Sequence, residues 1–221
     1  MTTISGNLFD PAKAAEVAFV LLDKVRQSRG EATKVRFMKW IYLAERLSYE
    51  RYGEPLTGDM LFSMKHGPVL SKTLRMIEAP SANSAGNDIW NAVVEVEKHG
   101  ARDYLKIRED APYTRTSDLR ALSDSEIDLV EEVFKRFGRM NATELETFLH
   151  KRENCAEWHW KEGDGSNPIE MEELFPAIGY TAEQTVALVE QMRAREALEE
   201  AFPRRSYVAE GAGPSSDRLA R

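Results

Sequence analysis

One segment limits the fold more than any other: from about residue 33 to residue 52, apolar side chains cover nearly the whole circumference of a predicted helix. At about 100° per residue, its polar side is a narrow stripe of Arg36, Lys39, Arg46 and Glu50. A helix that is apolar on nearly every side is buried on several sides. We therefore expect this helix at the centre of the fold, with its basic stripe as the solvated face.

The rest of the chain predicts more helices and one small β element. Apolar residues recur at helical spacing behind typical caps, which predicts helices over 11–30, 68–77, 124–138, 141–149 and 181–201. Alternation over 60–64 is typical of a short strand, and 94–97 with 104–107 predict a β-hairpin. The residues between 79 and 87 predict a loop. The fold class is α+β, mostly α-helical, with helices packed around the central helix and a small antiparallel β element.

The same pattern suggests how the chain is divided. We expect residues 1–178 to form one domain and residues 179–205 a C-terminal helix, since Pro203 cannot continue a helix. Residues 206–221 are small and polar, which predicts a disordered tail.

Composition excludes some classes of function and favours others. The formal charge of −7 does not attract nucleic acid through the overall field, although a local basic patch remains an alternative, and it suits a basic protein partner. Cys155 is the single cysteine, which excludes an internal disulfide and indicates a reducing compartment. No secretory segment opens the sequence, and the longest apolar runs are too short to span a bilayer. The sequence therefore predicts a cytoplasmic protein that contacts no membrane.

Candidates for chemistry are few. His150, Cys155 and His159, with Glu153 or Glu157 as a fourth ligand, come nearest to a metal site. Structural zinc sites usually pair their ligands at tighter spacing, so we favour a buried cysteine that binds no metal. The same cysteine and histidines lack the local sequence of a known cysteine hydrolase. Phosphate-binding glycine motifs are absent. We therefore predict no metal, no cofactor and no catalytic residue.

Two further features are candidates for binding. His66 precedes Gly67-Pro68 at a predicted helix start, where a histidine either completes the turn or contacts a ligand; we favour the first. Trp158 and Trp160 lie in a predicted surface segment, either as a lid over the core or as partner contacts.

The most specific pattern extends from residue 38 to residue 77. Residues 38–46 (MKWIYLAER), 52–59 (YGEPLTGD) and 66–69 (HGPV) resemble the K-L-L-Y-L-A-D-R, Y-G-x-P-I-T-G-D and H/Y-G-P-V motifs of the SocA-like antitoxins, the Panacea domain family. Residues 122–126 resemble its L-S-x-x-E helix start. Residues 145–150, followed by Trp158, resemble its E-L-x-x-x-T/S-H…W segment. The resemblance covers about residues 8–165, with the motifs in order.

This resemblance implies an antitoxin that binds and neutralises a cognate protein toxin, with no reaction of its own. The mechanism is either direct masking of the toxin or delivery of the toxin to the ClpXP protease. Because residues 206–221 are predicted to be disordered, we take them as the candidate contact to the protease. The candidate partner-binding residues are Thr57, Asp59, His66, Pro68 and Trp158. For Asp59 the alternative is a purely structural role, in which it caps or braces the turn.

Two other functions remain as alternatives. One is an enzyme that acts on a small molecule or nucleotide through Asp59, His66 and His150. The other is a DNA-binding regulator of its own operon, for which a basic groove around Arg36, Lys39 and Arg46 would be required.

Overall fold

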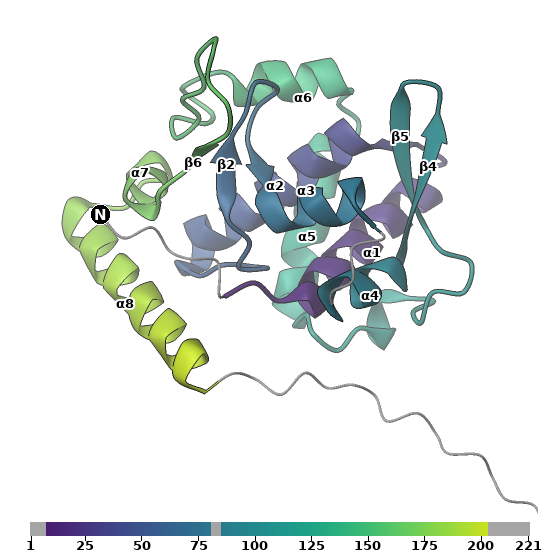
Figure 1. Cartoon of the computed structure of the whole chain (residues 1–221), viewed down its shortest axis with the longest axis horizontal. Helices are drawn as coiled ribbons and strands as arrows, with labels where there is room; N and C mark the ends of the chain where they lie inside the picture. The colour runs from purple at the N-terminus through teal and green to yellow at the C-terminus, as the bar shows by residue number, and fades with distance from the viewer. Residues whose placement is uncertain (1–7, 81–84, 203–221) are drawn as a thin grey trace, which may run out of the picture.

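The computed structural model describes residues 8–80 and 85–202, and its central element is helix α2, Lys34–Tyr52. Thr33 caps the helix by accepting a hydrogen bond from the backbone N–H of Arg36, and Gly53 ends it with a left-handed φ of 66°. Helices α1 (Pro11–Gln27), α5 (Asp124–Phe137) and α6 (Ala142–Leu149) all contact it, as Figure 1 shows. The predicted central helix is confirmed.

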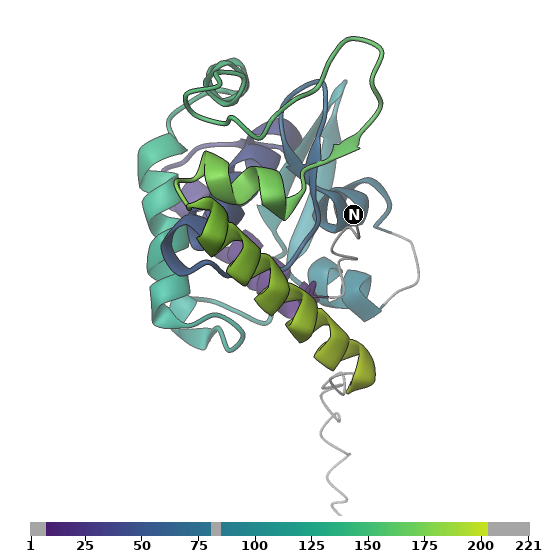
Figure 2. The same cartoon turned by 90° about the vertical axis from the view of Figure 1, so that its left-hand side faces the viewer.

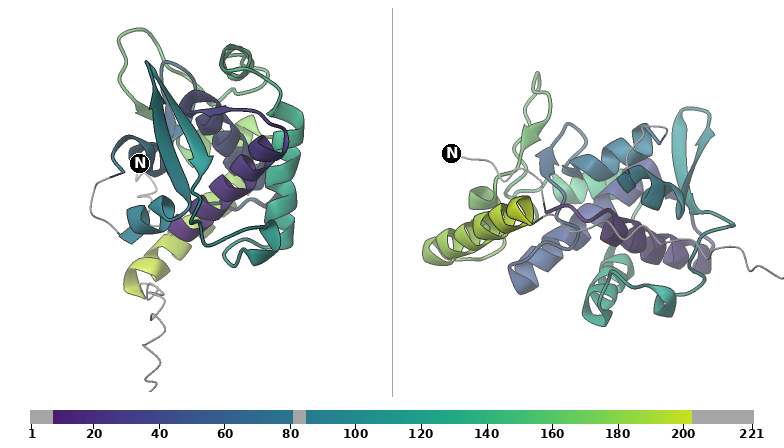
Figure 3. Two further views of the ribbon diagram at one scale, coloured as in Figure 1. Left: turned by 90° about the vertical axis from the view of Figure 1, so that its right-hand side faces the viewer. Right: turned by 60° about the horizontal axis from the view of Figure 1, so that its bottom comes forward.

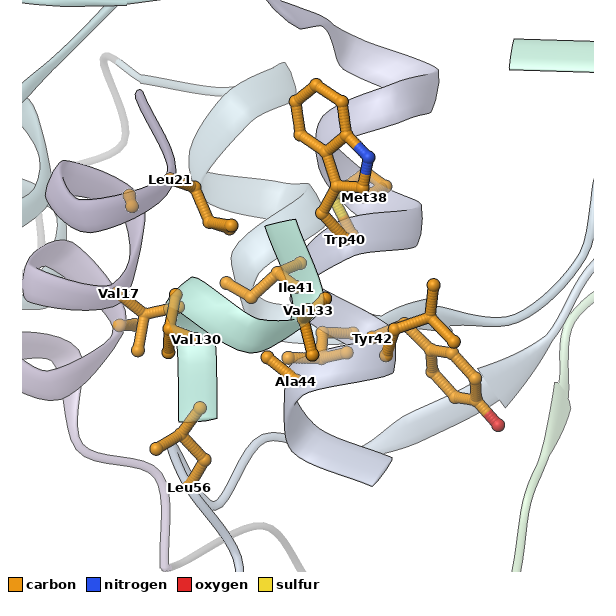
Figure 4. Packing of buried hydrophobic residues seen from close by; sticks show 14 of the residues in the cluster. Val17, Leu21, Met38, Trp40, Ile41, Tyr42, Ala44, Leu56, Val130 and Val133 are labelled. Carbon is orange, nitrogen blue, oxygen red and sulfur yellow. The ribbon is translucent and has the colours of Figure 1, made fainter. Parts of the chain in front are cut away.

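The core lies where α1, α2 and α5 meet. Val17 of α1 and Val130 of α5 are fully buried beside Ile41 of α2, as Figure 4 shows. The Tyr42 ring points away from this contact, toward the other side of α2. Helix α2 is therefore buried on two faces. One packs against α1 and α5, and the other, which carries Tyr42, forms the candidate site.

The described residues form two small antiparallel sheets. The first has the order β1-β5-β4 and contains the predicted hairpin, β4 (Val94–His99) with β5 (Arg102–Ile107), while β1 is Ala32–Thr33. The hairpin prediction is thus confirmed. The second sheet has the order β3-β2-β6, with strands Val69–Leu70, Leu61–Ser63 and Asn167–Pro168.

The second sheet changes one predicted boundary. Helix α3 is Ser71–Glu78 and does not begin at Pro68, because Val69 and Leu70 pair with β2 as strand β3. Strand β6 comes from a distant part of the chain, so local sequence carries no pattern for it.

Two helices were not predicted from the sequence. Helix α4, Ala85–Asn91, occupies part of the expected 79–87 loop, of which residues 81–84 lie outside the described part. Its Trp90 is fully buried, with its ring 6.0 Å from that of Phe37. Helix α7, Met171–Ala177, lies where no helix was predicted, and Glu170 and Glu173 form a capping box at its start.

Helix α8, Ala182–Ala201, follows α7 and packs against it. Val189 and Met192 are buried, while the C-terminal half extends beyond the body of the molecule (Figure 2). Figures 1 and 3 place α8 and the β4–β5 hairpin at opposite ends of the molecule. Among the described residues, no helix is both long enough and apolar enough to span a bilayer. The predicted tail, 206–221, lies outside the described residues. The mostly α-helical α+β fold is confirmed.

Candidate partner-binding site

The second face of α2 carries polar side chains at helical spacing. Its members are Lys39, Tyr42, Glu45 and Arg46. Lys39 and Glu45 are only 2% and 0% exposed. The expectation of a solvated stripe is therefore wrong for Lys39, while Glu50 is exposed as expected and Arg36 and Arg46 are half-buried. A buried charge is tolerated only when hydrogen bonds or an opposite charge compensate it. Each of these side chains finds that compensation in a loop, and the loops are thereby held in place.

Glu45 holds the turn that follows α2. Its Oε2 accepts hydrogen bonds from the backbone N–H and the hydroxyl of Thr57, at 2.8 and 2.7 Å, and its Oε1 accepts one from Gly58 N at 3.1 Å. Burial raises the pKa of the Glu45 carboxyl to about 7, although these donors oppose the rise. Thr57 also accepts, through its carbonyl, a bond from Asp10 N. The turn is therefore fixed to both α2 and the start of α1.

Asp59 links the same turn to α3. Its carboxylate accepts bonds from Lys72 N at 2.8 Å and from the N–H and hydroxyl of Thr73 at 2.7 and 2.8 Å. The N–H groups of Lys72 and Thr73 belong to the first turn of α3, where no carbonyl of the helix can accept from them. Asp59 therefore caps that helix. Burial raises the pKa of Asp59, against the effect of these bonds.

Glycine is required at position 58, which bonds to the Glu45 carboxylate and directly precedes Asp59. It has a φ of 71°, and a Cβ there would overlap the carbonyl oxygen of Leu8. Only glycine combines this backbone conformation with so close an approach.

Lys39 holds the loop of residues 64–68, which joins β2 to β3. Its Nζ donates to the carbonyl of Pro68 at 2.9 Å. Burial lowers the pKa of Lys39 to about 7, while Glu146 acts in the opposite direction. A Cβ on Gly67, whose φ is 94°, would lie 3.1 Å from Nζ. The loop therefore lies directly over the buried amine.

Tyr42 and Arg46 hold a third piece of chain, the segment of residues 150–161. Glu157 accepts from the Tyr42 hydroxyl at 2.7 Å and from Arg46 Nε at 2.6 Å. Cys155 Sγ is 3.5 Å from the same hydroxyl. Burial raises the pKa of the Cys155 thiol to about 12, so the thiol stays protonated and does not suit a nucleophile.

The 150–161 segment and the 64–68 loop meet at Trp158. Its indole N–H donates to the carbonyl of Met64 at 2.9 Å, and its ring stacks on His150 with centroids 3.9 Å apart. His66 Nδ1 lies 3.1 Å from Oε1 of Glu146 on α6. Burial lowers the pKa of His150. The two pieces of chain thus form one surface, with His66 exposed and Trp158 half-buried.

The predicted site residues fall into two groups. Thr57 and Asp59 are 1% and 3% exposed, and Pro68 is buried, so these three lie beneath the surface. His66 and Trp158 lie at the surface and adjoin through residues 64–68. The enzyme alternative requires Asp59, His66 and His150 to lie together, but the carboxylate of Asp59 contacts neither histidine and bonds to α3. Asp59 instead has the capping role that was its alternative.

The other constellations considered as alternatives are not assembled among the described residues. No group of three His, Cys, Asp or Glu side chains suited to a metal ion occurs in residues 8–80 and 85–202. Arg36 donates to the carbonyls of Gly138 and Met140, and Arg46 pairs with Glu157. With Lys39 buried as well, the three basic residues line no groove for DNA.

Five polar residues hold the loops of the site, and none was predicted in this role: Lys39, Tyr42, Glu45, Arg46 and Glu157. Lys39 and Arg46 were candidates for a DNA groove, and Glu157 was a possible metal ligand. One sequence pattern could have predicted them: polar residues recur every three or four positions in an otherwise apolar helix. A buried helix carries such residues only where they have hydrogen-bond partners.

Comparison with known proteins places the same region in a family. A family model described as the SocA-like antitoxin, Panacea domain, matches residues 37–159, which is more than half of the chain. No significant match was found among curated proteins or among solved structures. The matched residues contain most of α2, the 64–68 loop, α6 and nearly all of the 150–161 segment. The chain therefore belongs to the SocA-like antitoxin family and carries its Panacea domain.

Proposed function

We propose that the chain is the antitoxin of a toxin–antitoxin pair and neutralises a cognate protein toxin in the cytoplasm by binding it. The toxin would lie against the surface formed by the 64–68 loop and the 150–161 segment, and its own functional surface would be masked. The buried polar face of α2 carries this proposal, because it holds both pieces of chain rigidly at one surface. Preorganised surfaces bind more tightly, since less conformational freedom is lost on association.

The candidate residues have different parts in this proposal. His66 and Trp158 contact the toxin directly, while Thr57, Asp59 and Pro68 shape the loops from below. Trp158 is suited to the contact because a half-buried indole adds large apolar area at low entropic cost. The binding requires no cofactor and no chemical step.

A finer form of the proposal makes the chain an adaptor that hands the toxin to the ClpXP protease. Residues 206–221 would then be the contact to the protease. Deletion of these residues separates the two forms by measurement of the toxin's half-life in cells. The adaptor form predicts slower decay without the tail, and direct masking predicts unchanged decay and unchanged neutralisation.

Co-expression with the protein encoded by the adjacent open reading frame tests the proposal itself. We expect that protein alone to arrest growth, and the chain to restore growth. A variant with His66→Ala and Trp158→Ala should lose this rescue while remaining soluble and folded.

His99 offers a matched control for His66. The two side chains are 66% and 68% exposed, and each faces one glutamate, at 3.5 and 3.1 Å. His99 lies on the β4–β5 hairpin, so His99→Ala should leave the rescue intact. An adjacent gene product that is never toxic, or rescue that survives the double variant, contradicts the proposal.

A further inference from the structure

The 64–68 loop covers two buried nitrogen atoms that lack a full set of hydrogen-bond partners. A Cβ on Gly67 would lie 3.1 Å from Nζ of Lys39 and 3.6 Å from Nε2 of His150, so both atoms lie directly beneath the loop. Among the described residues, the carbonyl of Pro68 is the one acceptor of the Lys39 amine. Nε2 of His150 is buried and has no hydrogen-bond partner in the same part of the chain. Water would reach both nitrogen atoms if the loop lifted.

The closed loop therefore favours the uncharged form of the Lys39 amine. Lys39 forms no ion pair within residues 8–80 and 85–202, and Glu146, the carboxylate that attracts it, is bonded to His66 instead. A buried ammonium without a bonded counter-charge is costly, and such a group responds by losing its proton. Burial accordingly lowers the pKa of Lys39 to about 7, from the 10.5 that the hydrated amine would recover in an open loop.

Few hydrogen bonds hold the loop closed. Among the described residues, three side chains bond to it: Lys39, Glu146 and Trp158. Glu146 does so through an exposed pair with His66, and exposed pairs contribute little. The bond from Trp158 carries no charge. The Lys39 amine is therefore the buried connection that depends on pH.

We propose that the 64–68 loop is a proton-linked latch, which closes as Lys39 releases a proton and opens as the amine takes one up. Acidification favours the open form, and a rise in pH favours the closed form that the toxin contacts. The inference rests on the proposed function for this consequence and adds a form of regulation at the same surface.

The other titratable groups around Lys39 limit the pH range in which the amine dominates. Burial lowers the pKa of His150 from 6.5, so this group also takes up a proton on opening, but at lower pH. His66 and Glu146 attract each other more strongly when the imidazole is charged, which favours closure in acid. The pKa of the Cys155 thiol is raised to about 12, so the thiol stays protonated at neutral pH. Between pH 7 and pH 8.5 the Lys39 amine therefore sets the slope.

Hydrogen exchange of indole N–H groups in the full chain, without toxin, tests the latch. The indole N–H of Trp158 donates to the carbonyl of Met64 at 2.9 Å, so it exchanges when the loop lifts. One proton taken up on opening predicts that the opening equilibrium falls about fifteenfold from pH 7 to pH 8.5, after correction for intrinsic exchange.

Trp160 offers a matched control for Trp158. It is also half-buried on the 150–161 segment, but its indole N–H donates to Asp164 and Gly165, at 3.1 and 3.0 Å, and not to the 64–68 loop. Its corrected exchange should change less than about twofold over the same range. Equal slopes at the two indoles, or no slope at Trp158, overturn the inference.

Low concentrations of urea show whether the loop opens on its own. A local opening exposes little surface, so exchange at Trp158 should not respond to urea well below the unfolding transition. A response as strong as that of the slowest core amides would mean that the loop opens only when the whole chain unfolds. That result contradicts a latch.

Three variants assign the slope to its group. Lys39→Met removes the titrating amine, so the slope at Trp158 should disappear, whereas Lys13→Met, at a half-buried lysine of α1, should preserve it. His66→Ala removes another bond of the loop and should raise opening about two- to fivefold at each pH with the slope unchanged. A slope that survives Lys39→Met, or one that His66→Ala removes, contradicts the inference.

Growth rescue keeps this inference separate from the proposed function, because the exchange measurements need no toxin. If the chain neutralises a toxin but the slope is absent or survives Lys39→Met, the antitoxin role stands and only the inference fails. If the slope depends on Lys39 but no toxin is neutralised, the latch stands and the proposed function fails.

Discussion

The imidazole of His150 stacks on the indole of Trp158, with ring centroids 3.9 Å apart and an angle of 10° between the planes. His150 ends α6, while Trp158 reaches the 64–68 loop through its bond to Met64. One aromatic pair thus connects a helix end, the 150–161 segment and a loop nearly a hundred residues earlier in the sequence. This connection places His66 and Trp158 in the same surface.

The Trp158 connection predicts that binding is more sensitive than folding to loss of one hydrogen bond. Trp158→Phe keeps an aromatic ring against His150 but removes the donor to Met64 O. We expect about 1 kcal/mol lower free energy of unfolding in urea, the usual net value of such a bond. Affinity for the toxin, measured by calorimetry, should fall by a larger free energy because the 64–68 loop loosens. Loss of stability without loss of affinity would contradict the role given to Trp158.

Glu45 should be essential for stability. Glu45→Ala leaves the N–H and hydroxyl of Thr57 and the N–H of Gly58 without their acceptor inside the protein. Unsatisfied buried donors cost about 1–3 kcal/mol each when a partner is removed, so we expect a loss of about 3 kcal/mol in urea unfolding. Glu50→Ala in the same helix, at an exposed position, is the control and should cost less than about 1 kcal/mol. Equal effects would show that the buried bonds add nothing.

Gly58 and Gly100 form a second matched pair. Both have a positive φ, 71° and 63°, but a Cβ on Gly100 meets nothing within 4 Å, whereas a Cβ on Gly58 overlaps the backbone of Leu8. Gly100→Ala should therefore cost only the left-handed backbone conformation, about 1 kcal/mol. Gly58→Ala should cost about 3 kcal/mol or more, since the turn must move. Melting temperatures and urea midpoints measure both variants, and equal losses would contradict the tight packing of the turn.

The buried amine of Lys39 predicts a pH dependence of stability. Its pKa is about 7 in the folded chain against 10.5 for the free side chain, so the unfolded state binds more protons between these values. The Lys39 contribution to stability should therefore rise from pH 7 to about pH 10.5, by about 1.4 kcal/mol for each unit of difference between the two pKa values. Above about pH 9 the buried Cys155 thiol, whose pKa is raised to about 12, acts in the opposite direction, so the net rise is expected between pH 7 and about pH 9. Below pH 7 the amine is charged in both states and adds no slope.

Lys39→Met identifies the source of that slope. The variant keeps an unbranched side chain of similar length and removes the titrating group, so the alkaline rise should disappear in urea unfolding measured across the range. A rise of the same size in the variant would assign the slope to other groups. The variant also loses the bond to Pro68 O, so it should be compared with the wild type by slope and not by stability at one pH.

Local patterns predicted much of the fold. The capping boxes at Ser123, Asn141 and Thr181 begin α5, α6 and α8 as expected. Such caps depend on residues three positions apart, so a short stretch of sequence is enough to specify them. The β4–β5 hairpin is local in the same sense.

The parts that were missed depend on distant contacts. Strands β3 and β6 have two residues each, and each forms by pairing with β2. Two residues are too few to show an alternating pattern in the sequence. Helix α4 depends on the burial of Trp90. Among the site residues, His66 and Trp158 could be chosen from motifs. The burial of Thr57 and Asp59 could not be predicted, because Thr57 donates to Glu45 of α2 and Asp59 accepts from Thr73 of α3.

Hydrogen exchange of the chain, alone and in complex with the toxin from the adjacent reading frame, shows which surface the toxin covers. We expect toxin binding to slow exchange of the backbone amides in the 64–68 loop and the 150–161 segment. The β4–β5 hairpin should exchange at the same rate in both states. Protection confined to the hairpin or to α8, with the 64–68 loop and the 150–161 segment unchanged, would contradict toxin binding at the surface that these two pieces of chain form.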